Sequence, residues 1–207
     1  MDHKKMFLAS SFAEVAGLFK EFENNLNGKT VAFIPTAGKV EKVIFYIAAG
    51  RKALQNLGLT MRELDISAAA PDEIEAVLSA CDYIYISGGN TFYLLQELRK
   101  SGTDRMIISE VNAGKVYIGE SAGAIIAAPD IEYARGMDSI KKAPELIGYE
   151  GLGLVSFYPL PHVSNPPFAA APKKIIAAYS ASLPLSPFSN SEAIVVVNGD
   201  KVSITHY

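Results

Sequence analysis

The chain has 207 residues, 49% apolar and 20% charged, so it can bury a substantial core and has the composition of a folded globular protein. Its net charge of −3, with no basic run longer than two residues, argues against a nucleic-acid partner. The single cysteine, Cys81, excludes an internal disulfide and a thiolate-rich metal site.

In chain order, the first predicted elements are a strand over residues 6–9 and a helix after it. Ser11 and Glu14 have the spacing of a capping box, in which each side chain satisfies a free backbone N–H of the other residue. Further along, short apolar runs typical of strands alternate with amphipathic segments typical of helices. Strands are expected at 30–35, 61–66, 82–90 and 115–119, and helices at 41–58, 71–80, 91–102 and 104–114, with Asn90 as a cap.

This alternation predicts an α/β fold, a doubly wound and mostly parallel sheet flanked by helices on both faces. After Ala128 the pattern loosens, and residues 129–150 are expected to form loops or a short hairpin. A late helix is predicted at 172–183, and a C-terminal edge hairpin at 193–205 that turns at Asn198 and Gly199. We expect residues 1–207 to form one domain.

Membrane and export signals are weak in this sequence. Lys4 and Lys5 precede an apolar stretch, but Glu14 interrupts it too early for a signal peptide. No apolar run approaches the ~20 residues that cross a bilayer. We therefore expect a soluble, cytoplasmic protein without a membrane partner.

The segment VYIGESAGAII contains a complete G-x-S-x-G pattern, from Gly119 to Gly123. A strand is predicted before it and a helix from Ile125 onward, which is the setting in which a nucleophilic serine sits on a strained turn. The simpler alternative is that the small residues let a helix pack on a strand and that Ser121 only caps the helix. The strand–turn–helix context favours Ser121 as a nucleophile.

A serine nucleophile needs a base, and the chain has three histidines. His3 and His206 lie at the chain ends, which often fray, whereas His162 lies inside the chain in the segment YPLPHVSNPP. His162 is therefore the candidate base. The carboxylates between it and the serine are candidates for the third residue, and spacing does not choose among them: Asp130, Glu132, Asp138, Glu145 and Glu150.

An oxyanion hole needs two backbone N–H groups. Ala122, directly after the serine, is expected to provide one. The second is expected from the glycine pair Gly88 and Gly89, which follows a strand that should end at the same edge of the sheet.

Three segments together resemble the aspartyl dipeptidase (dipeptidase E) family of serine peptidases, relatives of cyanophycinase with the class I glutamine amidotransferase-like fold. The segments are SGGNTFYLLQEL, YIGESAGAIIAAPDI and GLGLVSFYPLPHVSN, and the overall plan matches from about residue 5 to 207. The resemblance implies a small peptide substrate, with no metal and no organic cofactor. It also implies the site residues: Ser121 as nucleophile, His162 as base, Asp138 in RGMDSI as the third member, Gly88 and Ala122 as oxyanion donors, and Gly89 and Asn90 in substrate binding.

The sequence departs from that family after the histidine. The aspartyl dipeptidases carry arginine there to hold an acidic side chain, whereas this chain has VSNPPFAAAPKKI, in which Lys173 and Lys174 are the basic residues. A lysine lacks the bidentate fork of arginine. Two further hypotheses therefore accompany the peptidase: an esterase or acyltransferase with the same triad, and a non-catalytic binding protein on the same scaffold.

Overall fold

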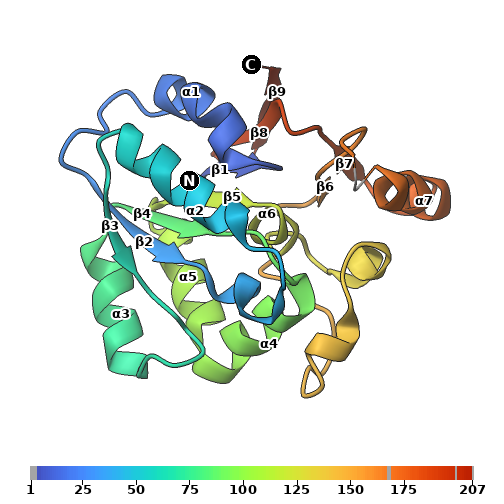
Figure 1. Ribbon diagram of the computed structural model, residues 1–207, viewed down its shortest axis with the longest axis horizontal. Coiled ribbons are helices and arrows are strands. Elements are labelled where there is room, and N and C mark those ends of the chain that lie inside the picture. Colours follow the sequence, from blue (N-terminus) through green and yellow to red (C-terminus); the bar gives the residue numbers. More distant parts are fainter. Residues whose placement is uncertain (1–3, 167–168, 199, 207) are drawn as a thin grey trace.

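The computed structural model describes residues 4–166, 169–198 and 200–206. Within them, seven strands form the main sheet in the order β3-β2-β4-β5-β1-β8-β9 (Figure 1). Strands β1 to β5 run parallel, and β8 and β9 add an antiparallel edge. These strands are β1 (Lys5–Ala9), β2 (Thr30–Ile34), β3 (Thr60–Glu63), β4 (Tyr83–Ile86), β5 (Val116–Glu120), β8 (Glu192–Val197) and β9 (Asp200–His206).

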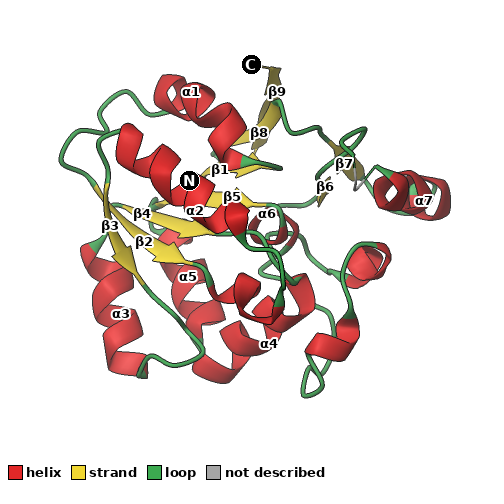
Figure 2. Ribbon diagram, viewed as in Figure 1, coloured by secondary structure: helices red, strands yellow, loops and turns green. Residues whose placement is uncertain are grey.

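Helices cover both faces of this sheet, as Figure 2 shows. Helices α1 (Phe12–Phe22) and α2 (Phe45–Asn56) lie on one face, where they bury a core with Phe7, Phe33 and Tyr85. Helices α3 (Pro71–Ala80), α4 (Thr91–Ser101) and α5 (Thr103–Asn112) lie on the other. Strands β1, β2, β4 and β5 are almost entirely buried because both sides of the sheet are covered there. This arrangement confirms the predicted doubly wound α/β fold.

The carboxyl ends of the parallel strands meet at one edge of the sheet. Ser10 follows β1, a 3₁₀ turn η1 (Thr36–Val40) follows β2, Gly88 follows β4 and Ser121 follows β5. In open α/β sheets this edge forms the crevice in which ligands bind. The fold therefore gathers the predicted site residues of β4 and β5 at one place.

A second, two-stranded sheet was not predicted from the sequence. Its strands β6 (Tyr158–Leu160) and β7 (Leu185–Pro187) pair in parallel, and α7 (Ala170–Tyr179) lies between them in the chain. Figure 1 shows this unit beside the carboxyl edge of the main sheet. Both strands are too short and too rich in proline to give an alternating pattern, so the periodicity of the sequence could not reveal them.

Several local predictions need correction. The helix after Ser121 is only one turn, α6 (Ala122–Ile125), and the segment after it contains the 3₁₀ turns η2 (Glu132–Gly136) and η3 (Ile140–Lys142). In place of a hairpin, an isolated bridge joins Asp130 to Glu150. The side chain of Ser11 makes no capping bond.

The C-terminal hairpin forms as predicted, with Asn198 at a φ of 54°, while Gly199 lies outside the described residues. Asn90 also caps α4 as predicted, since its side chain accepts a hydrogen bond from Tyr93 N. Among the described residues, no helix has the length and apolar character needed to span a bilayer.

Candidate active site

Ser121 sits on a sharp turn between β5 and α6. Its backbone has a φ of 50° and a ψ of −106°, a conformation that a non-glycine residue adopts only when the surroundings impose it. The backbone fixes the residue on both sides: Ser121 N donates to Ala9 O at 2.8 Å, and Ser121 O accepts from Ala124 N at 2.9 Å. The turn places the serine side chain at the carboxyl edge of the sheet.

Small residues around Ser121 are required by close backbone approach. A Cβ at Gly119 would lie 2.4 Å from Gly123 O, and one at Gly123 would lie 2.2 Å from Ile86 O. Both distances are far below van der Waals contact, so neither position tolerates a side chain without backbone movement. The glycines of the G-x-S-x-G pattern thus let α6 pack directly on β4 and β5.

His162 lies next to the serine in space, although 41 residues separate them in sequence. Its Nε2 is 2.8 Å from Ser121 Oγ. It follows β6, in a loop where it has a φ of 64° and where His162 N donates to Ser10 Oγ at 3.1 Å. The structure therefore brings the predicted nucleophile and base into hydrogen-bond distance, in the geometry that proton transfer requires.

The other imidazole nitrogen meets a residue that the sequence did not single out. His162 Nδ1 is 3.0 Å from Oδ1 of Asn190, in the loop after β7. Hydrogen bonds tie the two loops together: Asn190 N donates to Asn165 Oδ1 at 2.8 Å, and Asn165 N donates to His162 O at 3.2 Å. The parallel pair β6–β7 thus presents His162 and Asn190 side by side.

Asp138, the predicted third residue, is held elsewhere. Its Oδ2 accepts hydrogen bonds from Thr91 N at 2.9 Å and Thr91 Oγ1 at 2.5 Å, at the start of α4. Among the described residues, the carboxylate of Glu14 acts on His162 and raises the histidine pKa. The assignment of Asp138 as the partner of His162 is therefore corrected: in this structure Asn190 occupies that place.

Burial raises the pKa of Asp138 to about 6, although its bonds from Thr91 favour the ionised form. A folded-state pKa above the usual value of 3.8 means that the folded protein holds this proton while the unfolded chain has lost it. The ionised carboxylate therefore lowers the free energy of unfolding as pH rises from about 4 through 6, and the full cost persists above pH 6.

We expect Asp138→Asn to remove this pH dependence. Relative to wild type, the variant should gain about 2 kcal/mol in unfolding free energy between pH 4 and pH 7.5. Urea titrations of both proteins at the two pH values measure this change. Asp72→Asn, at an exposed position in the first turn of α3, controls for removal of a carboxylate. An equal effect of Asp138→Asn at both pH values would contradict the expectation.

The predicted oxyanion donors lie on either side of Ser121. Ala122 follows the serine at the start of α6, and a Cβ on Gly88 would meet Ser121 Cβ at 3.2 Å. The N–H of Gly88 interacts with the carboxylate of Glu120 and lowers its pKa. Gly89 has a φ of 139° and its Cα lies against the backbone of Ala37, in a conformation and space that only glycine fits.

Asn90, predicted to bind substrate, has a structural task in this geometry. It is fully buried, its Oδ1 accepts from Tyr93 N at 3.0 Å, and its Nδ2 donates to Ser139 O at 3.2 Å. Both ends of the amide are therefore used to hold the start of α4 and the loop around Asp138.

Glu120 is buried next to Ser121 and belongs to the support of the turn. Its carboxylate accepts from Tyr85 OH at 2.7 Å and from Phe12 N at 2.9 Å. Burial raises its pKa, whereas these hydrogen bonds lower it. The side chain of Glu120 thus fastens β5 to β4 and to the start of α1.

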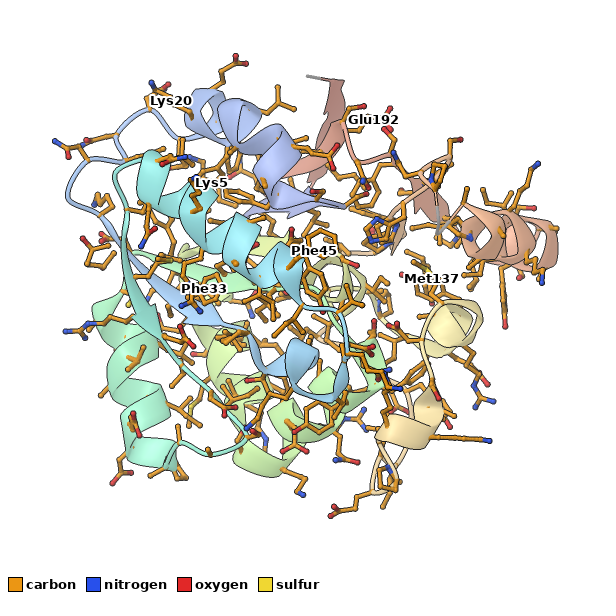
Figure 3. The ribbon with its side chains drawn as sticks, viewed as in Figure 1. Lys5, Lys20, Phe33, Phe45, Met137 and Glu192 are labelled. Carbon is orange, nitrogen blue, oxygen red and sulfur yellow. The ribbon has the colours of Figure 1, made fainter. Side chains whose placement is uncertain are left out.

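The ring of Tyr46 packs beside Gly88. A Cβ on Gly88 would meet its ring at 3.4 Å, and its hydroxyl is buried without a hydrogen-bond partner among the described residues. Burial, followed by Glu41, Glu120 and Asp138, raises the pKa of Tyr46 to about 12. In Figure 3, Phe45 and Met137 mark the two segments that contribute Tyr46 and Asp138.

In the part of the chain that the structure describes, the lysines near this site are either paired or exposed. Lys142 pairs with Glu41 at 2.6 Å, and Lys173 and Lys174 are exposed on α7. No arginine follows Arg135 in the sequence. Among the described residues, no group of three or more histidine, cysteine, aspartate or glutamate side chains could hold a metal ion.

A serine on a strained strand–helix turn, with a histidine nitrogen 2.8 Å from its hydroxyl, is an arrangement that serine hydrolases use, serine-type peptidases among them. The family model of Peptidase family S51 matches residues 6–205. This chain belongs to that family, which confirms the resemblance to the aspartyl dipeptidases.

Similar proteins support the membership of this chain in the peptidase family. An uncharacterized peptidase of Listeria innocua is 55% identical over 193 residues, which are 93% of this chain and 92% of that protein. Peptidase E of Salmonella arizonae is 35% identical over 143 residues, 69% of this chain and 59% of the relative. A crystal structure from Listeria monocytogenes, classed with peptidase E, superposes with a TM-score of 0.95 at 51% identity and covers 99% of this chain and 98% of its own.

Proposed function

We propose that this peptidase hydrolyses short peptides through Ser121, His162 and Asn190. The observation that carries the proposal is the continuous line of hydrogen bonds from Ser121 Oγ through the imidazole to Asn190 Oδ1. Peptidase E proteins among the relatives support a peptide as substrate. The chemistry requires no metal or organic cofactor.

In this mechanism His162 Nε2 accepts the proton of Ser121 Oγ while the oxygen attacks the peptide carbonyl. Ala122 N–H donates one hydrogen bond to the oxyanion, and the Gly88–Gly89 turn donates the second through Gly89 N–H, because Gly88 N–H interacts with Glu120. His162 then gives the proton to the leaving amine, and water repeats the sequence to release the acyl group. Asn190 accepts from Nδ1–H throughout, so the imidazole keeps its orientation.

The charges near Tyr46 bear on the choice of substrate. Glu41, Glu120 and Asp138 all act on Tyr46, which lies beside Gly88 and Ser121, and Lys142 already neutralises Glu41. The carboxylate of Asp138 would repel an acidic side chain on the substrate, whereas Lys142, the basic residue of this group, is already paired with Glu41. We therefore expect Asp-Xaa dipeptides to be no better substrates than Ala-Xaa dipeptides.

The test is hydrolysis of a dipeptide panel that contains Asp-Xaa, neutral, basic and β-linked members. We expect wild type to hydrolyse neutral members, with kcat/KM for Asp-Xaa equal or lower. The panel is repeated with Ser121→Ala to exclude a contaminating peptidase. No turnover of any member by folded protein would overturn the proposal, and strong preference for Asp-Xaa would overturn the argument from charge.

The pH dependence of kcat/KM should follow His162. Burial lowers the pKa of His162 below its usual 6.5, although Asn190 and Glu14 oppose the shift. The base must be neutral, so activity rises with pH through this pKa, and we expect the midpoint below pH 6.5. A pH–rate profile measures it, and a midpoint at or above pH 7 would contradict a neutral, half-buried His162 as the base.

A further inference from the structure

In the proposed site, an asparagine contacts the histidine where serine peptidases commonly use a carboxylate. A carboxylate is hydrogen-bonded to the other side of this asparagine. Asn190 Nδ2 donates to Oε1 of Glu14 at 3.1 Å. Glu14 is an exposed residue in the first turn of α1, 176 positions away in sequence. The hydrogen-bonded line is therefore Ser121, His162, Asn190 and Glu14.

Glu14 can only accept hydrogen bonds when ionised, and this has consequences along the line. Nδ2 of Asn190 must face Glu14, so Oδ1 must face the imidazole. Oδ1 can only accept, so Nδ1 of His162 must carry the hydrogen. Nε2 is then the acceptor, which is the form that can take the proton of Ser121.

Glu14 also supplies the charge that an amide lacks. When His162 takes the proton from Ser121 it becomes a cation, and a neutral asparagine stabilises this cation less than a carboxylate would. Glu14 acts on His162 electrostatically and raises its pKa in the structure. Another acid near Asn190, Glu192 at the start of β8, accepts a hydrogen bond from Ser189 N at 2.5 Å.

We propose that Glu14 is a positioning residue of the active site, which orients the Asn190 amide, thereby selects the Nδ1–H tautomer of His162, and places a negative charge behind the neutral amide. The inference rests on the proposed function for its kinetic consequences. It also explains why Ser11 and Glu14 form no capping box: the Glu14 side chain is directed to Asn190 instead.

The decisive kinetic test compares the effect of Glu14→Gln on kcat in the wild-type protein and in an Asn190→Asp variant, where we expect effects of opposite sign. Glu14→Gln keeps an acceptor but removes the charge and the fixed orientation, so we expect kcat to fall about threefold, and about tenfold for Glu14→Ala. In an Asn190→Asp background, the carboxylate at position 190 would face the carboxylate of Glu14 and the two would repel each other. There the same Glu14→Gln change should raise kcat, because it removes this repulsion and lets the amide N–H at position 14 donate to the carboxylate at position 190. A purely structural Glu14 would give the same sign in both backgrounds, and that result would overturn the proposal.

Glu21→Gln is the matched control. Glu21 is exposed in the last turn of the same helix. Figure 3 labels its neighbour Lys20, at the end of α1 that lies away from Glu192 and the segment of Asn190. We expect unchanged kcat for this variant. A loss equal to that of Glu14→Gln would mean that any charge removal on α1 has this effect, and would overturn the specific role of Glu14.

A second readout does not need turnover. Nitrogen NMR of ¹⁵N-histidine-labelled protein distinguishes the Nδ1–H from the Nε2–H tautomer of His162. We expect the Nδ1–H form in wild type and a mixture in Glu14→Ala. Unchanged tautomer populations in folded Glu14→Ala would overturn the proposal about Glu14, whereas the expected populations without any dipeptide turnover would overturn only the proposed function.

Discussion

Replacing Ser121 by alanine should reduce kcat on the best dipeptide substrate by roughly 10⁴-fold or more. Without Oγ there is no nucleophile, and the remaining oxyanion donors and binding contacts supply only residual acceleration. The fold should tolerate the change, since alanine meets the same positive φ of 50° that serine already adopts. Thermal unfolding and the dipeptide assay, measured on the same preparations, test both expectations.

Ser164→Ala is the control for this variant. Ser164 also has a positive φ, of 65°, and it is exposed two residues after His162. We expect it to keep wild-type kcat. If Ser121→Ala retained more than about a tenth of the activity, Ser121 could not be the nucleophile.

Replacing Asn190 by alanine should have the next largest effect, a loss of about 10²-fold in kcat with a smaller change in KM. The change removes the acceptor for Nδ1–H of His162, which then can adopt the wrong tautomer. It also removes a hydrogen bond that raises the pKa of His162, so the midpoint of the pH–rate profile should move to lower pH. The measurement is kcat/KM across pH for wild type and Asn190→Ala.

Asp138→Asn separates the two candidates for the third residue. Asp138 bonds to Thr91 rather than to His162, so this variant should leave the midpoint of the pH–rate profile where it is in wild type, whatever its effect on kcat. A shifted midpoint in Asp138→Asn together with an unshifted one in Asn190→Ala would restore Asp138 as the partner of His162.

Most of the fold could be predicted because it depends on local patterns. The apolar runs of β2, β4 and β5 and the helices between them recur at the spacing of a doubly wound sheet, and the turn at Ser121 is marked by glycines that close packing demands. The pair β6–β7 could not be predicted, because three-residue strands containing proline show no periodicity. Its parallel pairing is set by tertiary contacts.

The difference between local sequence patterns and tertiary contacts also explains which site residues the sequence predicts and which it does not. Ser121 is marked by its motif, and His162 is one of only three histidines and the only one inside the chain. Asn190 and Glu14 carry no such mark: their roles arise because the loop after β7 and the start of α1 meet beside His162. The family resemblance favours Asp138, but it extends across a loop, where residue type alone does not determine which neighbour a side chain contacts.

The central claim is that His162 activates Ser121 for attack. Reaction with a fluorophosphonate, followed by peptide mapping by mass spectrometry, tests it without knowledge of the substrate. We predict a single adduct on Ser121, formed quickly in wild type and very slowly in His162→Ala. An adduct on another residue, or no adduct on folded wild-type protein, would contradict the claim.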